Sequence, residues 1–198
     1  SGQDYPLPVD KNWLIAPIVL GAPLMFPLGL SVDLLNDSLL WTAKFGSLMV
    51  AIGLGVNIWY MARAVPNRNK PAWMFVLALM ALKVAAQLSA VFLPETLWLG
   101  QHGLRVLYLH LLLLGFVSTL FFVAIHSVFS KSSRAGLYMF MGTVLILLST
   151  LVLISGLWPT EWLPNNIYLW VTIGALLPSV AILFELGIVS IRNFRRAI

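Results

Sequence analysis

His110 stands within a long apolar run of the chain, where an imidazole has several chemical uses. A histidine ring can ligate a metal or a haem iron, hydrogen-bond a quinone, or carry a proton near neutral pH. Arg105 and Tyr108 precede it in the same stretch. An ionisable side chain inside a membrane costs about 2.5–3.5 kcal/mol on insertion scales, so His110 requires a compensating interaction or a function.

Polar residues of two other apolar runs are expected near the depth of His110. At the helical rise of ~1.5 Å per residue, Lys44, Gln87 and His110 share a level in the outer half of the membrane. Lys83 lies one turn below Gln87, near the middle of its run. We therefore predict a polar or cofactor-binding site made of His110, Lys83, Gln87, Lys44, Arg105 and Tyr108.

Several of these residues can also be explained by a structural or interfacial role, without a cofactor or a reaction. Lys44 could extend its stem to the outer interface. Glu185, near the cytoplasmic end of the last run, could pair with Arg192. For His110, a hydrogen bond to a neighbouring helix competes with a role as ligand or proton carrier. Lys83 is the hardest to explain in this way, because a lysine at mid-membrane cannot easily reach water.

The other two histidines do not complete a haem site with His110. His126 follows in the same run, about 24 Å away along the axis and on a nearly opposite face, so the two rings cannot share one iron. We expect His126 at the cytoplasmic interface and His102 in a solvated connection. A b-type haem with His110 as its metal ligand therefore needs a second ligand from another subunit, a second half of a longer protein, or a dimer; a quinone is the alternative cofactor.

Composition identifies the setting of these residues as a lipid bilayer. The chain has 198 residues, of which 60% are apolar and 10% charged, and its mean hydropathy is +0.93. A soluble domain of this size needs more charged surface. The net charge of +5 comes mainly from connections and the C-terminus, so it does not indicate nucleic-acid binding. The absence of cysteine excludes disulfides, iron–sulfur clusters and thiolate metal sites.

The pattern predicts one all-α transmembrane helical domain over residues 1–198, a polytopic bundle of six spanning helices. A span of about 30 Å of hydrocarbon takes roughly 20 residues. The six apolar runs lie near residues 12–32, 38–62, 73–93, 104–129, 137–158 and 167–190. Pro17, Pro23 and Pro27 interrupt the first run, so we expect a kinked helix there.

The orientation of the bundle follows from the basic residues of its connections. Alternate connections and the C-terminal tail carry Arg63, Arg68, Lys70, Lys131, Arg134, Arg192, Arg195 and Arg196. The opposite connections carry Asp33, Asp37, Glu95 and Glu161, with Arg105 as the one base nearby. Both termini are therefore predicted to lie in the cytoplasm.

Two stretches resemble known membrane proteins. They read Lys83-x-x-x-Gln87-x-Ser89 and Arg105-x-x-Tyr108-x-His110-x-x-Leu-Leu-Gly115-Phe-x-Ser118. The pattern is similar to uncharacterised polytopic inner-membrane proteins of Bacteroidetes-type bacteria. A histidine followed by an apolar helix with a glycine is also faintly similar to NnrS-type haem–copper membrane proteins, which use several intramembrane histidines where this chain has one. The resemblance covers the third and fourth runs and implies a bacterial inner-membrane location.

Three functions are compatible with these features. The chain could be a subunit of a larger membrane complex, redox-linked through a haem, a quinone or a proton path around His110. It could be a small-solute or ion transporter that uses buried Lys83 and Glu185. It could also be a structural accessory subunit whose polar residues hold helices together. The expected partners are other membrane subunits or further copies of the chain in a homo-oligomer.

Overall fold

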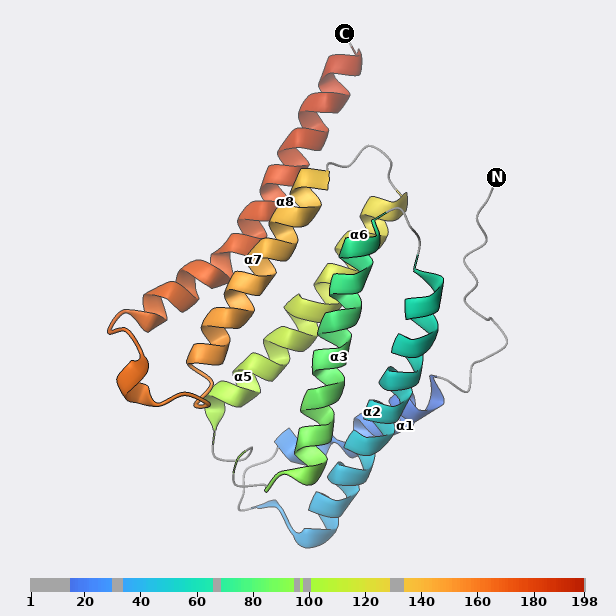
Figure 1. Cartoon of the computed structure of the whole chain (residues 1–198), viewed down its shortest axis with the longest axis vertical. Coiled ribbons are helices and arrows are strands. Elements are labelled where there is room, and N and C mark those ends of the chain that lie inside the picture. Colours follow the sequence, from blue (N-terminus) through green and yellow to red (C-terminus); the bar gives the residue numbers. More distant parts are fainter. Residues whose placement is uncertain are drawn as a thin grey trace. The chain divides into compact units, whose positions relative to one another are not determined.

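The computed structural model describes residues 15–29, 34–65, 69–94, 97, 101–128 and 134–197. These residues form helices joined by turns, and no strand occurs among them. In chain order the elements are α1 (Ala16–Leu24), the 3₁₀ helix η2 (Phe26–Gly29), α2 (Asp37–Ala64), α3 (Lys70–Phe92), α5 (His102–His110), the π-helix η4 (Leu111–Ser118), α6 (Thr119–Val128), α7 (Arg134–Leu153), the 3₁₀ helix η5 (Thr160–Trp162) and α8 (Ile167–Ala197) (Figure 1).

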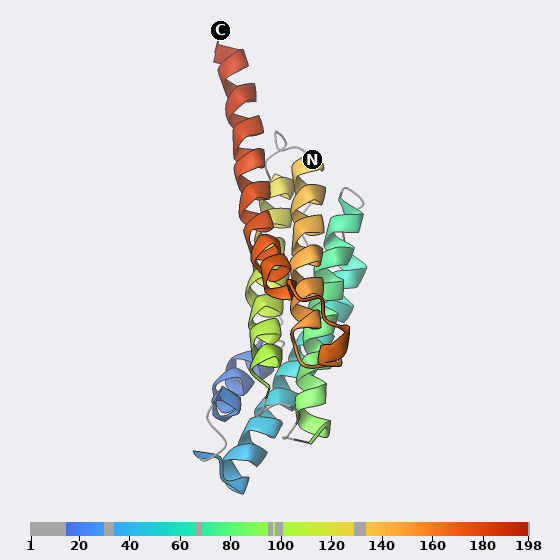
Figure 2. The ribbon, with the colours of Figure 1, turned by 90° about the vertical axis from the view of Figure 1, so that its left-hand side faces the viewer.

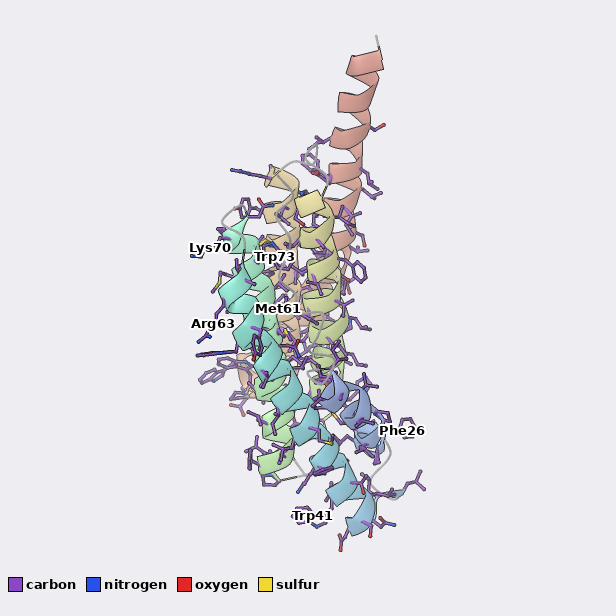
Figure 3. The ribbon with its side chains drawn as sticks, turned by 90° about the vertical axis from the view of Figure 1, so that its right-hand side faces the viewer. Phe26, Trp41, Met61, Arg63, Lys70 and Trp73 are labelled. Carbon is purple, nitrogen blue, oxygen red and sulfur yellow. The ribbon has the colours of Figure 1, made fainter. Side chains whose placement is uncertain are left out.

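Five helices among the described residues are long and apolar enough to cross a membrane. They are Asp37–Ala64, Lys70–Phe92, His102–Ser127, Arg134–Leu153 and Ile167–Ile188. Each coincides with a predicted apolar run to within a few residues. Large apolar side chains cover their outward surfaces; Trp41 of Asp37–Ala64, for example, is 71% exposed and points away from its helix (Figure 3). Such surfaces require lipid, so the chain is an integral membrane protein.

The first apolar run differs from the single kinked helix that the sequence predicts. In its described part, α1 ends at Leu24 and η2 follows from Phe26. Pro27 has no backbone N–H to continue the α-helical ladder, and its ring clashes with the preceding turn. The N–H of Met25 bonds instead to the carbonyls of Gly21 and Ala22, which closes the helix. Residues 12–14 and 30–32 of the predicted span lie outside the described part.

The chain divides into two compact units. Unit 1 contains α1, η2, α2 and the part of α3 from Leu77 onward. Glycines bring α1 and α2 close together, since a Cβ on Gly21 would lie 2.7 Å from the carbonyl oxygen of Gly46. A Cβ on Gly53 would lie 2.7 Å from Cγ1 of Ile18. Gly46 and Gly53 are seven residues apart, so they lie on one face of α2 and form the contact with α1.

Unit 2 contains α3 up to Val76, together with α5, η4, α6, α7 and α8. Its core includes Ala72, Val76, Val123 and Leu137, all essentially inaccessible to solvent. Helices α7 and α8 run antiparallel and lie side by side in both ribbon views (Figures 1 and 2). Helix α8 contains Pro178 and bends about midway along its length, as expected where a proline removes a backbone hydrogen bond.

Two glycines set the register of α7 against α8. A Cβ on Gly174, early in α8, would lie 3.1 Å from Oγ1 of Thr150, late in α7. A Cβ on Gly136, early in α7, would overlap the carboxylate of Glu185, late in α8. The missing side chains therefore allow close approach at both ends of the helix pair, and one end carries an ionisable group.

Candidate functional site

The predicted site residues fall into both units. Lys44, Lys83 and Gln87 belong to unit 1, whereas Arg105, Tyr108 and His110 belong to unit 2. Lys83 and Gln87 are buried, with 6% and 2% of their surfaces exposed, and the other four are half-buried. The grouping of His110 with the residues of unit 1 stays a prediction.

Gln87 belongs to a hydrogen-bonded cluster that joins three elements of unit 1. Ser47 Oγ on α2 donates to Gln87 Oε1 on α3 over 2.9 Å. Gln87 Nε2 donates to Met25 Sδ at the end of α1 over 3.2 Å, and the Ser47 hydroxyl lies 3.5 Å from the same sulfur. Interhelical bonds of this kind stabilise helix packing in lipid. They also hold α1 against α2 and α3 at the point where α1 breaks.

Lys44 leans along α2 toward its N-terminal end. Its Nζ lies 5.7 Å from the ring centroid of Trp41, within reach of a cation–π interaction. Trp41 is largely exposed, and tryptophan rings favour the headgroup level. This contact favours the interpretation in which Lys44 extends to the interface.

His110 ends α5 and makes a hydrogen bond within its own helix. Its Nδ1 lies 2.8 Å from the carbonyl oxygen of Val106, one turn earlier. A carbonyl oxygen only accepts, so Nδ1 carries the proton and donates it to this bond. In the neutral ring the lone pair is therefore at Nε2, where it can bind a metal or accept a proton. The Nδ1 bond fixes the tautomer and orients the ring.

The helix continues past His110 as a π-helix of eight residues, Leu111–Ser118. Its bonds join residues five apart, and two hydroxyls follow the same spacing. Ser118 Oγ donates to the carbonyl of Leu113 over 2.9 Å, and Thr119 Oγ1 lies 3.4 Å from that of Leu114. π-Helical segments are rare and often occur at functional sites. Here the segment starts at the residue directly after His110.

Arg105 and Tyr108 lie on a different face of α5 from His110. At about 100° per residue, Tyr108 is turned by about 200° from His110, whereas Arg105 and Tyr108 share a face. The prediction from the sequence placed Arg105, Tyr108 and His110 in one site. The backbone geometry divides them into an Arg105–Tyr108 face and a His110 face.

A second ionisable group in unit 2 involves residues that sequence reasoning did not pair. His126 on α6 is buried, with 5% of its surface exposed, and its Nε2 lies 3.8 Å from Glu185 Oε1 on α8. Phe122, one turn earlier on α6, packs against the imidazole at 4.7 Å between ring centroids. The side chain is therefore packed against α8, and the prediction that His126 lies at the level of the cytoplasmic interface stays a prediction. The predicted partner of Glu185, Arg192, has a side chain outside the described part.

The similar expected depth of His126 and Glu185 in the membrane is a sequence signal that could have indicated this pair. Both His126 and Glu185 are expected near the cytoplasmic ends of their runs, and Gly136 lies at the same end of the intervening run. A histidine, a carboxylate and a glycine at one level indicate a buried pair with room beside it. His102 is exposed, as expected.

The described residues contain no group of three histidine, cysteine or acidic side chains that could hold a metal ion. Any metal or haem bound at His110 would need further ligands from elsewhere. No protein family, curated protein or solved structure matches the chain.

Proposed function

We propose that this chain is a subunit of a larger membrane complex in which His110 serves a redox centre. The observation that carries the proposal is the bond from His110 Nδ1 to the Val106 carbonyl. Metal-ligating histidines usually donate their other ring N–H to a carbonyl or carboxylate, which fixes the ring and raises its basicity. The bond stays within α5, so it does not join two helices.

His110 would hold the iron of a b-type haem through Nε2, and another chain or a second copy would have to supply a second ligand. When bound, such a group would supply one-electron transfer. A quinol would instead donate a hydrogen bond to Nε2, and a proton path would use the same lone pair.

The proposed setting is a bacterial inner membrane with six spans and both termini in the cytoplasm. The described residues provide five candidate spans. The sixth would be completed by the first apolar run, residues 12–32, of which α1 and η2 are the described part. The basic connections support the orientation.

The test is a reduced-minus-oxidised visible spectrum of the protein purified in mild detergent. The expected result is a b-type signal that is lost in His110→Ala and retained in His102→Ala. His102 is a matched control because it is an exposed histidine on the same helix. A signal that survives His110→Ala would contradict the role of this residue. A flat wild-type spectrum would remove haem, and binding of a short-chain quinone to the wild type and to His110→Ala would then decide the remaining redox role.

The Ser47–Gln87–Met25 cluster favours a second function, that of a structural accessory subunit. All three side chains are used in joining helices. In this case the protein would copurify with a larger complex while neither cofactor binds. Transport is supported by the burial of Lys83 and Glu185, and substrate-dependent flux in liposomes distinguishes it from both other functions.

A further inference from the structure

The connection between α7 and α8, residues 154–166, exposes large apolar side chains (orange in Figure 1). Leu157, Trp158 and Trp162 are 62%, 43% and 70% exposed. A connection that lies in water carries mostly polar side chains, and exposed apolar groups close together indicate contact with a membrane or a protein. The surface of this connection therefore needs a partner, and the proposed redox role of His110 does not supply one.

Local backbone geometry gives this connection a defined conformation. Gly156 has a φ of 84°, the left-handed conformation in which a chain commonly leaves a helix. The N–H of Trp162 bonds to the carbonyl of Pro159 at η5, over 3.1 Å. The N–H of Ile167 bonds to the carbonyl of Pro164 where α8 begins, over 3.0 Å. Such bonds satisfy backbone polar groups within the connection, which lowers the cost of placing it beside hydrocarbon.

The two exposed tryptophans of the connection contact each other. The ring centroids of Trp158 and Trp162 are 6.2 Å apart, and the ring planes are tilted by 41°. The rings therefore form one aromatic surface. Tryptophan favours the boundary between lipid headgroups and acyl chains, because its ring is apolar and its N–H can stay hydrated there.

Exposed aromatic side chains continue into the first turn of α8. Tyr168, Leu169 and Trp170 are all exposed, and they belong to the candidate span Ile167–Ile188. Further along this span Leu176 is exposed as well. The aromatic surface of the connection thus leads along the chain into the lipid-facing surface of α8. This neighbourhood favours lipid as its partner over a second protein.

The distribution of charge also fits a bilayer surface. Glu161 is the only charged residue between Arg134 and Glu185. Glu161 and Asn165 are exposed, so the connection has a polar side that can remain in water. Because its one charge is acidic, the connection has no attraction to anionic headgroups. The chemistry that it fits is the boundary between the polar and apolar layers of the bilayer.

We propose that residues 154–166, together with the first turn of α8, form an anchor in the membrane interface whose partner is the phospholipid bilayer. The rings of Trp158 and Trp162 lie at the level of the headgroups, Leu157 reaches the acyl chains, and Glu161 stays in water. The anchor fixes the depth of the α7–α8 hairpin in the membrane. It does not depend on a cofactor at His110.

The experiment measures the depth of a nitroxide spin label in phosphatidylcholine liposomes. The chain has no cysteine, so Leu157→Cys places one label beside the two tryptophans. Collisions with oxygen, which enters lipid, are compared with collisions with a water-soluble nickel chelate. The oxygen-to-nickel ratio at Leu157→Cys should be several-fold higher than that of the free label in buffer. It should be lower than at Leu176→Cys, within the span, and higher than at Asn165→Cys, on the polar side of the connection.

Replacement of the rings tests whether they hold the connection in place. In a Trp158→Ser/Trp162→Ser background, the oxygen-to-nickel ratio at Leu157→Cys should fall toward that of the free label. An unchanged ratio would contradict an anchoring role of the two rings. Tyr168→Cys, at a position 75% exposed in the first turn of α8, gives a second measurement if Leu157→Cys fails to fold.

Two other results would overturn the proposal. If the ratio at Leu157→Cys equals that of the free label in buffer, the connection lies in water. If the label collides rarely with both oxygen and the nickel chelate, protein covers this surface and its partner is not lipid.

Discussion

Replacement of Gly136 by alanine is the most direct test of how the His126–Glu185 pair is held. The added Cβ would overlap Oε2 of Glu185, lie 2.7 Å from its Cδ and lie 3.2 Å from its Cβ. The first two atoms are at the flexible end of the side chain, so the carboxylate can move, but it must then leave its position opposite His126. The third atom is close to the backbone, so α7 and α8 must also separate slightly.

The expected loss of stability follows from these contacts. Overpacking of a well-packed site costs about 1–3 kcal/mol. Gly142 on the same helix is the matched control, because a Cβ there meets nothing within 4 Å. Alanine is better than glycine inside a helix by roughly 0.5–1 kcal/mol, so Gly142→Ala should stabilise the protein. Because both glycines lie inside α7, the gain in helix propensity is common to both variants, and their unfolding free energies should differ by the overpacking cost of about 1–3 kcal/mol.

The assay is reversible unfolding in mixed micelles, followed by helical circular dichroism, for both glycine variants and for Glu185→Ala. In the Glu185→Ala background most of the overlap disappears, so Gly136→Ala should cost much less than it does in the wild type. A double-mutant cycle measures this coupling directly. The reasoning fails if Gly136→Ala is as stable as Gly142→Ala, or if its cost is the same with and without the Glu185 side chain.

Two further predictions concern the other parts of the chain. Gln87→Leu should destabilise the protein by roughly 0.6 kcal/mol for each interhelical bond lost, whereas Asn57→Leu, which removes an amide bonded to its own helix, should have a smaller effect in the same unfolding assay. Equal effects would argue against an interhelical role for Gln87. Because the chain has no cysteine, Gln3→Cys and Ala197→Cys should react with an impermeant maleimide only from the cytoplasmic side, and Glu161→Cys only from outside; any other pattern contradicts the predicted orientation.

The positions of the spans could be predicted from the sequence because membrane thickness sets the length of an apolar run. Five of the six runs correspond to single long helical spans. The first does not in its described part, where α1 stops at Leu24. A hydropathy profile is the same for a kinked helix and for a broken helix, because it depends only on composition along the run. The difference depends on whether neighbouring groups satisfy the carbonyls that Pro23 and Pro27 leave free, which a sequence does not reveal.

Depth was also a good guide to burial, but a poor guide to partners. Lys83 and Gln87 are buried, as their mid-membrane positions indicate. The bonds of Gln87 to Ser47 and Met25 could not be predicted, because they depend on which faces of α1, α2 and α3 meet. Lys44 has a depth similar to that of Gln87, yet its charge is directed toward Trp41. The depth of a residue in the membrane restricts which residues can contact it. The rotation of each helix about its axis then decides which of these contacts form.

The π-helix changes the relative orientation of His110 and His126 around the axis of their span. The expectation that His110 and His126 face nearly opposite sides assumes a regular α-helix between them. Eight of the intervening residues are π-helical, and the wider turn shifts the phase of everything after it. The conclusion that the rings cannot share one iron still holds, because they remain about four turns apart along the axis. The phase shift instead sets the direction in which His126 faces, and in unit 2 that direction is toward Glu185. The π-helix therefore separates a histidine whose Nε2 can bind a cofactor from one whose Nε2 faces a buried carboxylate.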